Sequence, residues 1–262
     1  MSKEDLLVLL TNDDGGRAPG LQFLKREMET TARVVTVAPD EERSAASHSL
    51  TIHDPIRLIE VAEDDYTLTG TPADCVIFAL RKLMLRSPDL VISGINSGPN
   101  LGDDVLYSGT VAAAREAALY GIPAVAVSLV GKGEDLDYGP AACFIRDLVK
   151  EFYPDRTPRG TALNVNIPPG KPGAYRFTRQ GSKRAWSSIE EKMDPRGRRY
   201  YWIGRDESEV LVEADTDYQA ISDGVVSITP LQHDQTDYRT LKLLGNNTTD
   251  ALLRAGSSDP SP

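Results

Sequence analysis

Cysteine is scarce in this 262-residue sequence, which contains only Cys75 and Cys143, far apart along the chain. Their separation matches no metal-ligand spacing, so we interpret both as reduced core thiols. No apolar run reaches the roughly 18–20 residues that a membrane-spanning helix needs. The N-terminal segment MSKEDLLVLLTNDD also lacks the small-residue cleavage site of a secretory signal peptide. These absences predict a cytoplasmic protein without a membrane partner.

Positive charge is also in short supply, because the net charge is −10. Non-specific binding to a nucleic-acid polymer needs a basic surface, so we expect no such partner. A small anionic substrate stays compatible with this charge, since a bound cation reverses the local potential. The segment between Arg176 and Arg205 differs, with nine Lys or Arg residues, three Asp or Glu residues and several aromatic residues. We interpret it as a solvated hairpin or a subunit contact; a substrate-steering or nucleic-acid patch is the alternative.

The first two thirds of the chain alternate strand and helix signals. Hydrophobic residues make up 40% and charged residues 26%, an ordinary globular balance. Strands separated by helices predict an α/β fold: a Rossmann-like, mostly parallel sheet flanked by helices. The expected strands are 6–10, 33–39, 89–95, 124–129 and 162–167, and the expected helices are 19–29, 72–85, 108–123 and 141–153.

The pattern changes after the Pro-Pro-Gly at 168–170, where short alternating runs replace long apolar segments. The run MDPRGRRYYWIG predicts a hairpin with its turn near 195–197, and TDYRTLKLL predicts a terminal helix. Exposed strand edges and aromatic residues favour packing on another subunit, which predicts a homo-oligomer. We therefore expect a Rossmann-like catalytic core at 1–170 and a disordered tail at 251–262. Between them, at 171–250, we expect a C-terminal β-hairpin and arm appendage that serves oligomerisation.

Oxygen-bearing side chains follow the first, second and third core strands, in the loops TNDDG, PDEERSAASHS and GINSGPNLG. In open α/β sheets ligands bind at the carboxyl ends of the strands, so these loops should meet at one edge. Clustered carboxylate, amide and hydroxyl oxygens without nitrogen or sulfur favour Mg²⁺ or Mn²⁺ over Zn²⁺. A plain turn is the alternative interpretation of NDDG. The candidate metal ligands are Asp13, Asp14, Ser44 and Asn96.

A second candidate site is the helix start at Ser108, Gly109 and Thr110. Free backbone N–H groups and the helix dipole attract anions there, and Gly109 lets a phosphate approach the backbone. An ordinary N-cap is the alternative. Asn100 is a further candidate phosphate contact, and His48 is either a general acid or base or a structural residue. Neither common glycine-rich nucleotide fingerprint is present.

Seven motifs in order carry a resemblance to a known family: LLTNDDGGRAPG, VAPDEERSAASHSLT, GTPADCV, DLVISGINSGPNLGDDVLYSGTVAAAREA, GIPAVAVSL, NVNIP and SITPLQHDQTDY. Together they resemble the SurE (survival protein E) family of 5′-nucleotidases over nearly the whole chain. The resemblance implies a cytoplasmic, dimeric or tetrameric, metal-dependent phosphatase of nucleoside monophosphates. It also implies the metal site already named. Family members often have glycine in place of Ala45 and a bulkier residue in place of Gly16; neither position is a ligand.

A metal beside a phosphate cradle indicates a divalent-metal phosphomonoesterase that hydrolyses nucleoside 5′-monophosphates to nucleoside and phosphate. Asp13 and Asp14 are the expected catalytic residues, and one of them is the candidate base for the attacking water. A nucleotide-binding regulatory module without turnover is the alternative, and a metal-dependent hydrolase of another bond is a third. The carboxylate pair favours the enzyme, because pure anion binding does not need it.

Overall fold

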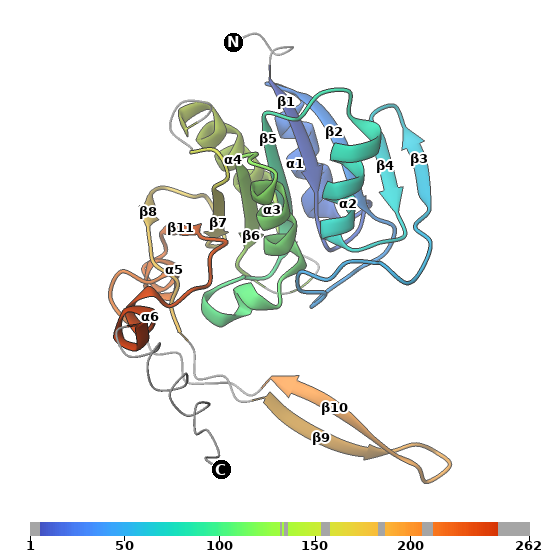
Figure 1. Cartoon of the computed structure of the whole chain (residues 1–262), viewed down its shortest axis with the longest axis vertical. Helices are drawn as coiled ribbons and strands as arrows, with labels where there is room; N and C mark the ends of the chain where they lie inside the picture. Colours follow the sequence, from blue (N-terminus) through green and yellow to red (C-terminus); the bar gives the residue numbers. More distant parts are fainter. Residues whose placement is uncertain are drawn as a thin grey trace, which may run out of the picture. The chain divides into compact units, whose positions relative to one another are not determined.

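The computed structural model describes residues 6–131, 133, 136–152, 158–182, 187–205 and 212–245. A nine-stranded sheet in the order β3-β4-β2-β1-β5-β6-β7-β11-β8 forms the centre of this part (Figure 1). The run from β4 to β7 is parallel throughout, whereas β3 is antiparallel to β4, and β11 is antiparallel to β7 but parallel to β8. The predicted mostly parallel α/β sheet is confirmed. Its strands are β1 (Leu7–Thr11), β2 (Arg33–Pro39), β3 (Leu58–Ala62), β4 (Asp65–Leu68), β5 (Leu90–Ser97), β6 (Ala124–Leu129), β7 (Ala162–Ile167), β8 (Tyr175–Phe177) and β11 (Val226–Leu231).

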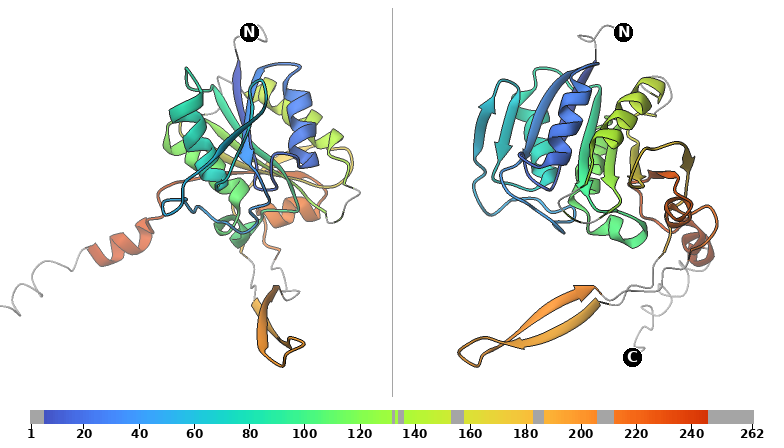
Figure 2. Two further views of the ribbon diagram at one scale, coloured as in Figure 1. Left: turned by 90° about the vertical axis from the view of Figure 1, so that its right-hand side faces the viewer. Right: turned by 180° about the vertical axis from the view of Figure 1, so that it is seen from behind.

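Helices cover both faces of this sheet, as the two views in Figure 2 show. Two apolar clusters lie between the sheet and the helices, one packed on α1 and α4 and the other on α2 and α3. Successive β1 side chains enter opposite clusters, because side chains alternate along a strand. The helical elements are α1 (Pro19–Met28), α2 (Pro72–Phe78), η1 (Ala79–Leu83), η2 (Gly102–Leu106), α3 (Gly109–Leu119), α4 (Gly139–Phe152), α5 (Asp217–Ser222) and α6 (Tyr238–Gly245).

Local sequence signals explain the helix starts. Pro19 and Pro72 each open a helix, where a missing N–H costs nothing. Thr71 and Asp74 form a capping box at the start of α2. The single helix expected over 72–85 is instead an α-helix to Phe78 followed by the wider π-helical turn η1, in which Met84 N–H donates to the Ala79 carbonyl.

The C-terminal third divides between the sheet and separate elements. β8 and β11 come from the 171–250 segment, and β11 is hydrogen-bonded directly to β7. Part of the expected appendage therefore belongs to the core sheet, while the boundary at 170 stays a prediction. The predicted hairpin is confirmed as β9 (Ser187–Met193) and β10 (Arg199–Arg205), with Gly197 at positive φ in the turn. The expected tail at 251–262 lies outside the described residues.

Among the described residues, 232–245 belong to a second unit of the chain. Its helix α6 confirms the predicted terminal helix and buries none of its residues in this single chain. Among the described residues, no helix is long and apolar enough to cross a membrane.

Candidate metal and phosphate site

Hydrogen bonds tie together the loops that follow β1, β2 and β5. The backbone N–H of Arg43, after β2, donates to the Asp13 carbonyl at 2.7 Å. The N–H of Ser97, at the end of β5, donates to Asp14 Oδ2 at 3.2 Å. The start of α3 joins them, because the Thr110 hydroxyl donates to Asp13 Oδ1. The structure thus gathers the expected loops at the carboxyl ends of the parallel strands.

Asp13 is almost fully enclosed and is packed against the first turn of α3. A Cβ added to Gly109 would lie 2.9 Å from Asp13 Cβ and 3.0 Å from its Oδ2. Side chains do not approach so closely, so glycine at 109 is what allows α3 to begin against this carboxyl group. Gly109 and Thr110 therefore fix the position of Asp13, a role that the sequence did not reveal.

The paired carboxyl groups of Asp13 and Asp14 bind their protons more tightly than exposed aspartates do. Burial raises the pKa of Asp13, against the lowering effect of the Thr110 hydrogen bond. Burial, with the neighbouring Asp13 charge, raises the pKa of Asp14 to about 6. The charge of Glu42 pushes both pKa values further in the same direction. A divalent cation would offset the cost of burying two neighbouring negative charges, because it stabilises both carboxylates in their charged form.

The remaining donors at this edge are also oxygen atoms. Asn96 donates its amide N–H to the Gly98 carbonyl at 2.8 Å, and its amide oxygen is the atom a cation would take. Ser44 is exposed, and its hydroxyl donates to Glu42 Oε1 at 2.6 Å. Within the described part of the chain no group of three or more His, Cys, Asp or Glu residues gathers around a metal-sized space. The candidate set of two carboxylates, an amide and a hydroxyl fits a hard cation such as Mg²⁺ or Mn²⁺.

Sequence reasoning missed Glu42, although it lies in the PDEER loop that was singled out. Glu42 holds the Ser44 hydroxyl and acts electrostatically on both aspartates. The signal was available, because three successive acidic residues follow Pro39. Only the folded chain distinguishes the one that faces the aspartates.

The side chains of the candidate phosphate contacts already bond to the protein. The Ser108 hydroxyl accepts from Val111 N–H at 3.0 Å, so the residue is an N-cap, and the Thr110 hydroxyl binds Asp13. Asn100 donates its amide N–H to Ser128 Oγ at 2.8 Å. What remains for an anion at this helix start is the backbone N–H of Gly109, because the N–H of Ser108 donates to the Asp104 carbonyl at 3.2 Å and that of Thr110 to Asp13.

His48 contacts α3 through Glu116. Its Nε2 lies 2.7 Å from Glu116 Oε2, and the Glu116 side chain is largely buried. The backbone N–H of Ser47 donates to the Tyr107 carbonyl at 3.0 Å. These contacts fasten the loop that carries Ser44, and they favour the structural interpretation of His48.

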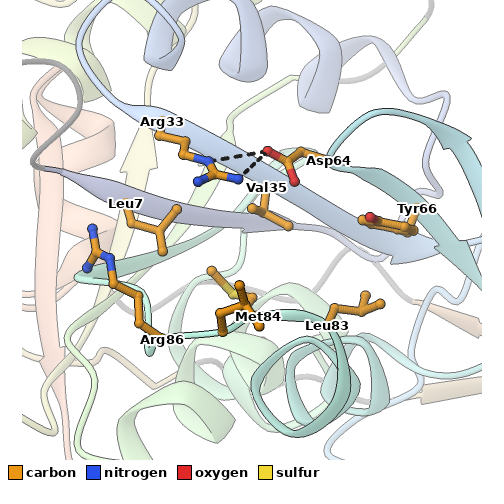
Figure 3. A pocket seen from close by; sticks show the side chains of 9 residues that line it. Leu7, Arg33, Val35, Asp64, Tyr66, Leu83, Met84 and Arg86 are labelled. Carbon is orange, nitrogen blue, oxygen red and sulfur yellow. Dashed lines mark hydrogen bonds and ion pairs between the residues drawn. The ribbon is translucent and has the colours of Figure 1, made fainter.

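A cavity of about 420 Å³ lies at the other end of the sheet (Figure 3). Leu7 and Arg33, the first residues of β1 and β2, line it together with Met84. Arg33 reaches across its rim to pair with Asp64 at 3.0 Å. This cavity is therefore at the amino ends of the strands and contains none of the candidate site residues.

Comparisons with known proteins all point to one family. The family described as Survival protein SurE matches residues 8–187. A protein of Geobacter sulfurreducens named 5′-nucleotidase SurE is 45% identical over 240 residues, which covers 90% of this chain and 92% of that protein. Its namesake in Desulforudis audaxviator is 47% identical over 246 residues, with 90% and 95% covered. The crystal structure of a SurE protein from Aquifex aeolicus superimposes with a TM-score of 0.81 at 41% identity, covering 92% of this chain and 98% of that one.

Proposed function

The chain belongs to the survival protein SurE family, and from that premise we infer that it is a 5′-nucleotidase that hydrolyses nucleoside 5′-monophosphates to nucleoside and phosphate. The observation that carries this function is the Asp13–Asp14 pair, held against the N-terminus of α3. Binding an anion without turnover would gain nothing from two carboxyl groups beside it. Metal-assisted hydrolysis of a phosphate ester uses both a site for the anion and carboxylates that hold the metal or accept a proton.

We assign the metal to Asp13, Asp14, Ser44 and Asn96, and the ion to Mg²⁺ or Mn²⁺. When bound, the cation supplies Lewis-acid polarisation of a phosphoryl oxygen. The raised pKa values of both aspartates and the all-oxygen donor set support this assignment.

The chain's own groups bind the phosphate and accept a proton. Of the helix-start residues Ser108, Gly109 and Thr110, Gly109 offers its backbone N–H to the phosphate oxygens, because the N–H of Ser108 donates to the Asp104 carbonyl and that of Thr110 to Asp13. Asn100, in the loop after β5, is the further candidate phosphate contact. Thr110 orients Asp13 through its hydroxyl. Asp14 is the better placed of the two carboxylates to accept the proton of the attacking water, because it is less buried than Asp13 and Thr110 does not bond to it.

Phosphate release tests the function directly. With Mn²⁺ or Mg²⁺ present, we expect the protein to release phosphate from a nucleoside 5′-monophosphate and from p-nitrophenyl phosphate, as measured by a colorimetric phosphate assay. Parallel reactions with 3′-monophosphates and polyphosphate define the substrate range. Nucleotide binding by calorimetry without any phosphate release would instead identify a regulatory module.

We propose that the β9–β10 hairpin joins subunits of a homodimer or tetramer. Its large apolar side chains are strongly exposed in the single chain; Ile203 is 81% exposed and Trp202 is 59% exposed. Monomeric proteins seldom leave such a run of aromatic and aliphatic side chains in water. This supports the oligomerisation role given to the 171–250 segment. A cytoplasmic location is also part of the proposal, and the free thiols of Cys75 and Cys143 support it, because the cytoplasm is a reducing compartment.

Shortening the hairpin should lower the oligomeric state. Ser188 and Gly204 lie directly opposite each other in the antiparallel register, so a two-residue Asn-Gly turn can replace residues 189–203 and rejoin the strands. Light scattering should give a multiple of the chain mass for the intact protein and a smaller mass for the shortened one. Ending the chain at Gly170 is a poorer test, because that also removes β11 from the sheet. An unchanged mass would assign the subunit contact to another surface.

A further inference from the structure

Asp217, in the C-terminal third, is a fully buried carboxylate that accepts three backbone hydrogen bonds. Its Oδ2 accepts from Gly102 N–H at 2.8 Å. Its Oδ1 accepts from Gly181 N–H at 2.8 Å and from Tyr218 N–H at 2.9 Å. Hydrogen bonds to a charged acceptor are about twice as strong as neutral ones, and a buried charge persists only when it is satisfied in this way. Asp217 is thus a firm link between three separate segments.

Two neighbours of Asp217 bind the same loop. Gln180 donates its side-chain N–H to the Gly102 carbonyl at 2.9 Å, and the Tyr218 hydroxyl donates to the Leu101 carbonyl at 3.1 Å. A Cβ added to Gly102 would lie 2.5 Å from the Tyr218 ring. The Tyr218 ring therefore packs against Gly102 where a side chain would clash, and the φ of +51° at this position is one that glycine adopts without strain.

The linked loop is the one that carries the candidate phosphate contacts. Gly102 begins η2, which leads directly to the helix start at Ser108. On the other side of Gly102, Asn100 is held by the sheet: its N–H donates to Asn166 Oδ1 at 2.8 Å, and its carbonyl accepts from Asn164 at 2.8 Å. The sheet fixes one end of this loop, and Asp217 fixes the part that continues toward α3.

We propose that Asp217 is a positioning residue of the phosphate-binding loop, acting through Gly102 and η2 on the anion site at the start of α3. This inference rests on the proposed function. The same carboxylate also holds Gly181, which precedes the hairpin segment in sequence, so it joins the root of the proposed subunit arm to the phosphate loop. Asp217 lies 115 positions from Gly102 along the chain.

Asp217→Asn tests the proposal with the smallest change in shape. An amide offers one acceptor oxygen, and its NH₂ group faces an N–H donor, so one of the three bonds is lost. We expect KM for a nucleoside 5′-monophosphate and Ki for inorganic phosphate to rise together about 10–100-fold, the range seen when an outer-shell partner of a site is removed. Asp223→Asn is the matched control, because Asp223 is an exposed carboxylate at the end of the same helix. It should leave KM and Ki unchanged.

A merely structural role predicts a different result, because partial unfolding lowers the active fraction and hence kcat, while KM and Ki stay constant. Unchanged constants in folded Asp217→Asn protein would overturn the proposal. Where that variant does not fold, Tyr218→Phe and Gln180→Ala each remove one bond to the loop and should raise Ki for phosphate about three- to tenfold; wild-type values in both would overturn it equally. Calorimetry of inorganic phosphate binding to these variants tests the positioning role separately from catalysis. If the wild type hydrolyses no nucleotide, the proposed function is refuted, but the binding constants still test the role of Asp217.

Discussion

Stripping the protein with EDTA should abolish phosphate release, and adding Mn²⁺ or Mg²⁺ should restore it. The expectation follows from the candidate donor set, which is all oxygen, and from two adjacent carboxyl groups whose pKa values are raised by burial. Without a cation, the like charges of Asp13 and Asp14 and the nearby Glu42 would also repel an incoming phosphate. The measurement is the initial rate before chelation, after it, and after metal is added back. Full activity in a metal-free sample would refute the metal assignment.

Thermal unfolding provides a readout of the metal that is independent of catalysis. A cation at 100 times its Kd stabilises the folded state by about 2.7 kcal/mol, which corresponds to roughly 5–10 °C in Tm for a chain of this size. The gain should depend on pH. Because the pKa of Asp14 is raised from 3.8 to about 6, the metal-free protein loses stability as pH rises through that window, and the cation offsets the loss above it. Stabilisation by Mn²⁺ should therefore be larger at pH 7.5 than at pH 5.

Asp13→Asn and Asp14→Asn should each lower kcat/KM at least about 100-fold, since each removes a charged ligand of the cation and Asp14→Asn also removes the proposed proton acceptor. Both variants should still fold, because an amide does not repel the remaining carboxylate. Above pH 6 the metal-free Asp14→Asn protein should melt at a higher temperature than the wild type, as the penalty for ionising Asp14 is gone. Steady-state kinetics and calorimetric Mn²⁺ titration measure the two effects.

Glu41→Gln is the matched control for these variants. Glu41 is an exposed carboxylate of the same β2 loop, paired with Arg43 at 2.9 Å, and it is not a proposed ligand. Its substitution should change kcat/KM less than about twofold, as expected for an exposed ion pair. Near-normal turnover in either aspartate variant would move the active site away from the NDDG turn.

Much of the candidate site could be predicted from local sequence patterns. The alternation of apolar strands and capped helices, together with the rule that ligands bind at the carboxyl ends of parallel strands, was enough to bring the NDDG, Ser44 and Asn96 loops to one edge. Thr110 was singled out correctly as part of the helix start, yet its hydroxyl binds Asp13. A hydroxyl at a helix N-terminus can serve a ligand or a neighbouring side chain, and the sequence pattern is the same for both.

The strand–helix order, the helix starts at Pro19, Pro72 and Ser108, and the β9–β10 hairpin could be predicted from the sequence, because they depend on periodicity and caps that span a few residues. Three other features became visible only in the folded chain: β8 and β11 complete the core sheet, Gly109 must be small beside Asp13, and Asp217 holds Gly102. In each of these features the groups that meet lie far apart along the chain. Such contacts follow from how whole layers pack and from which buried polar groups then need partners, and no local pattern encodes either.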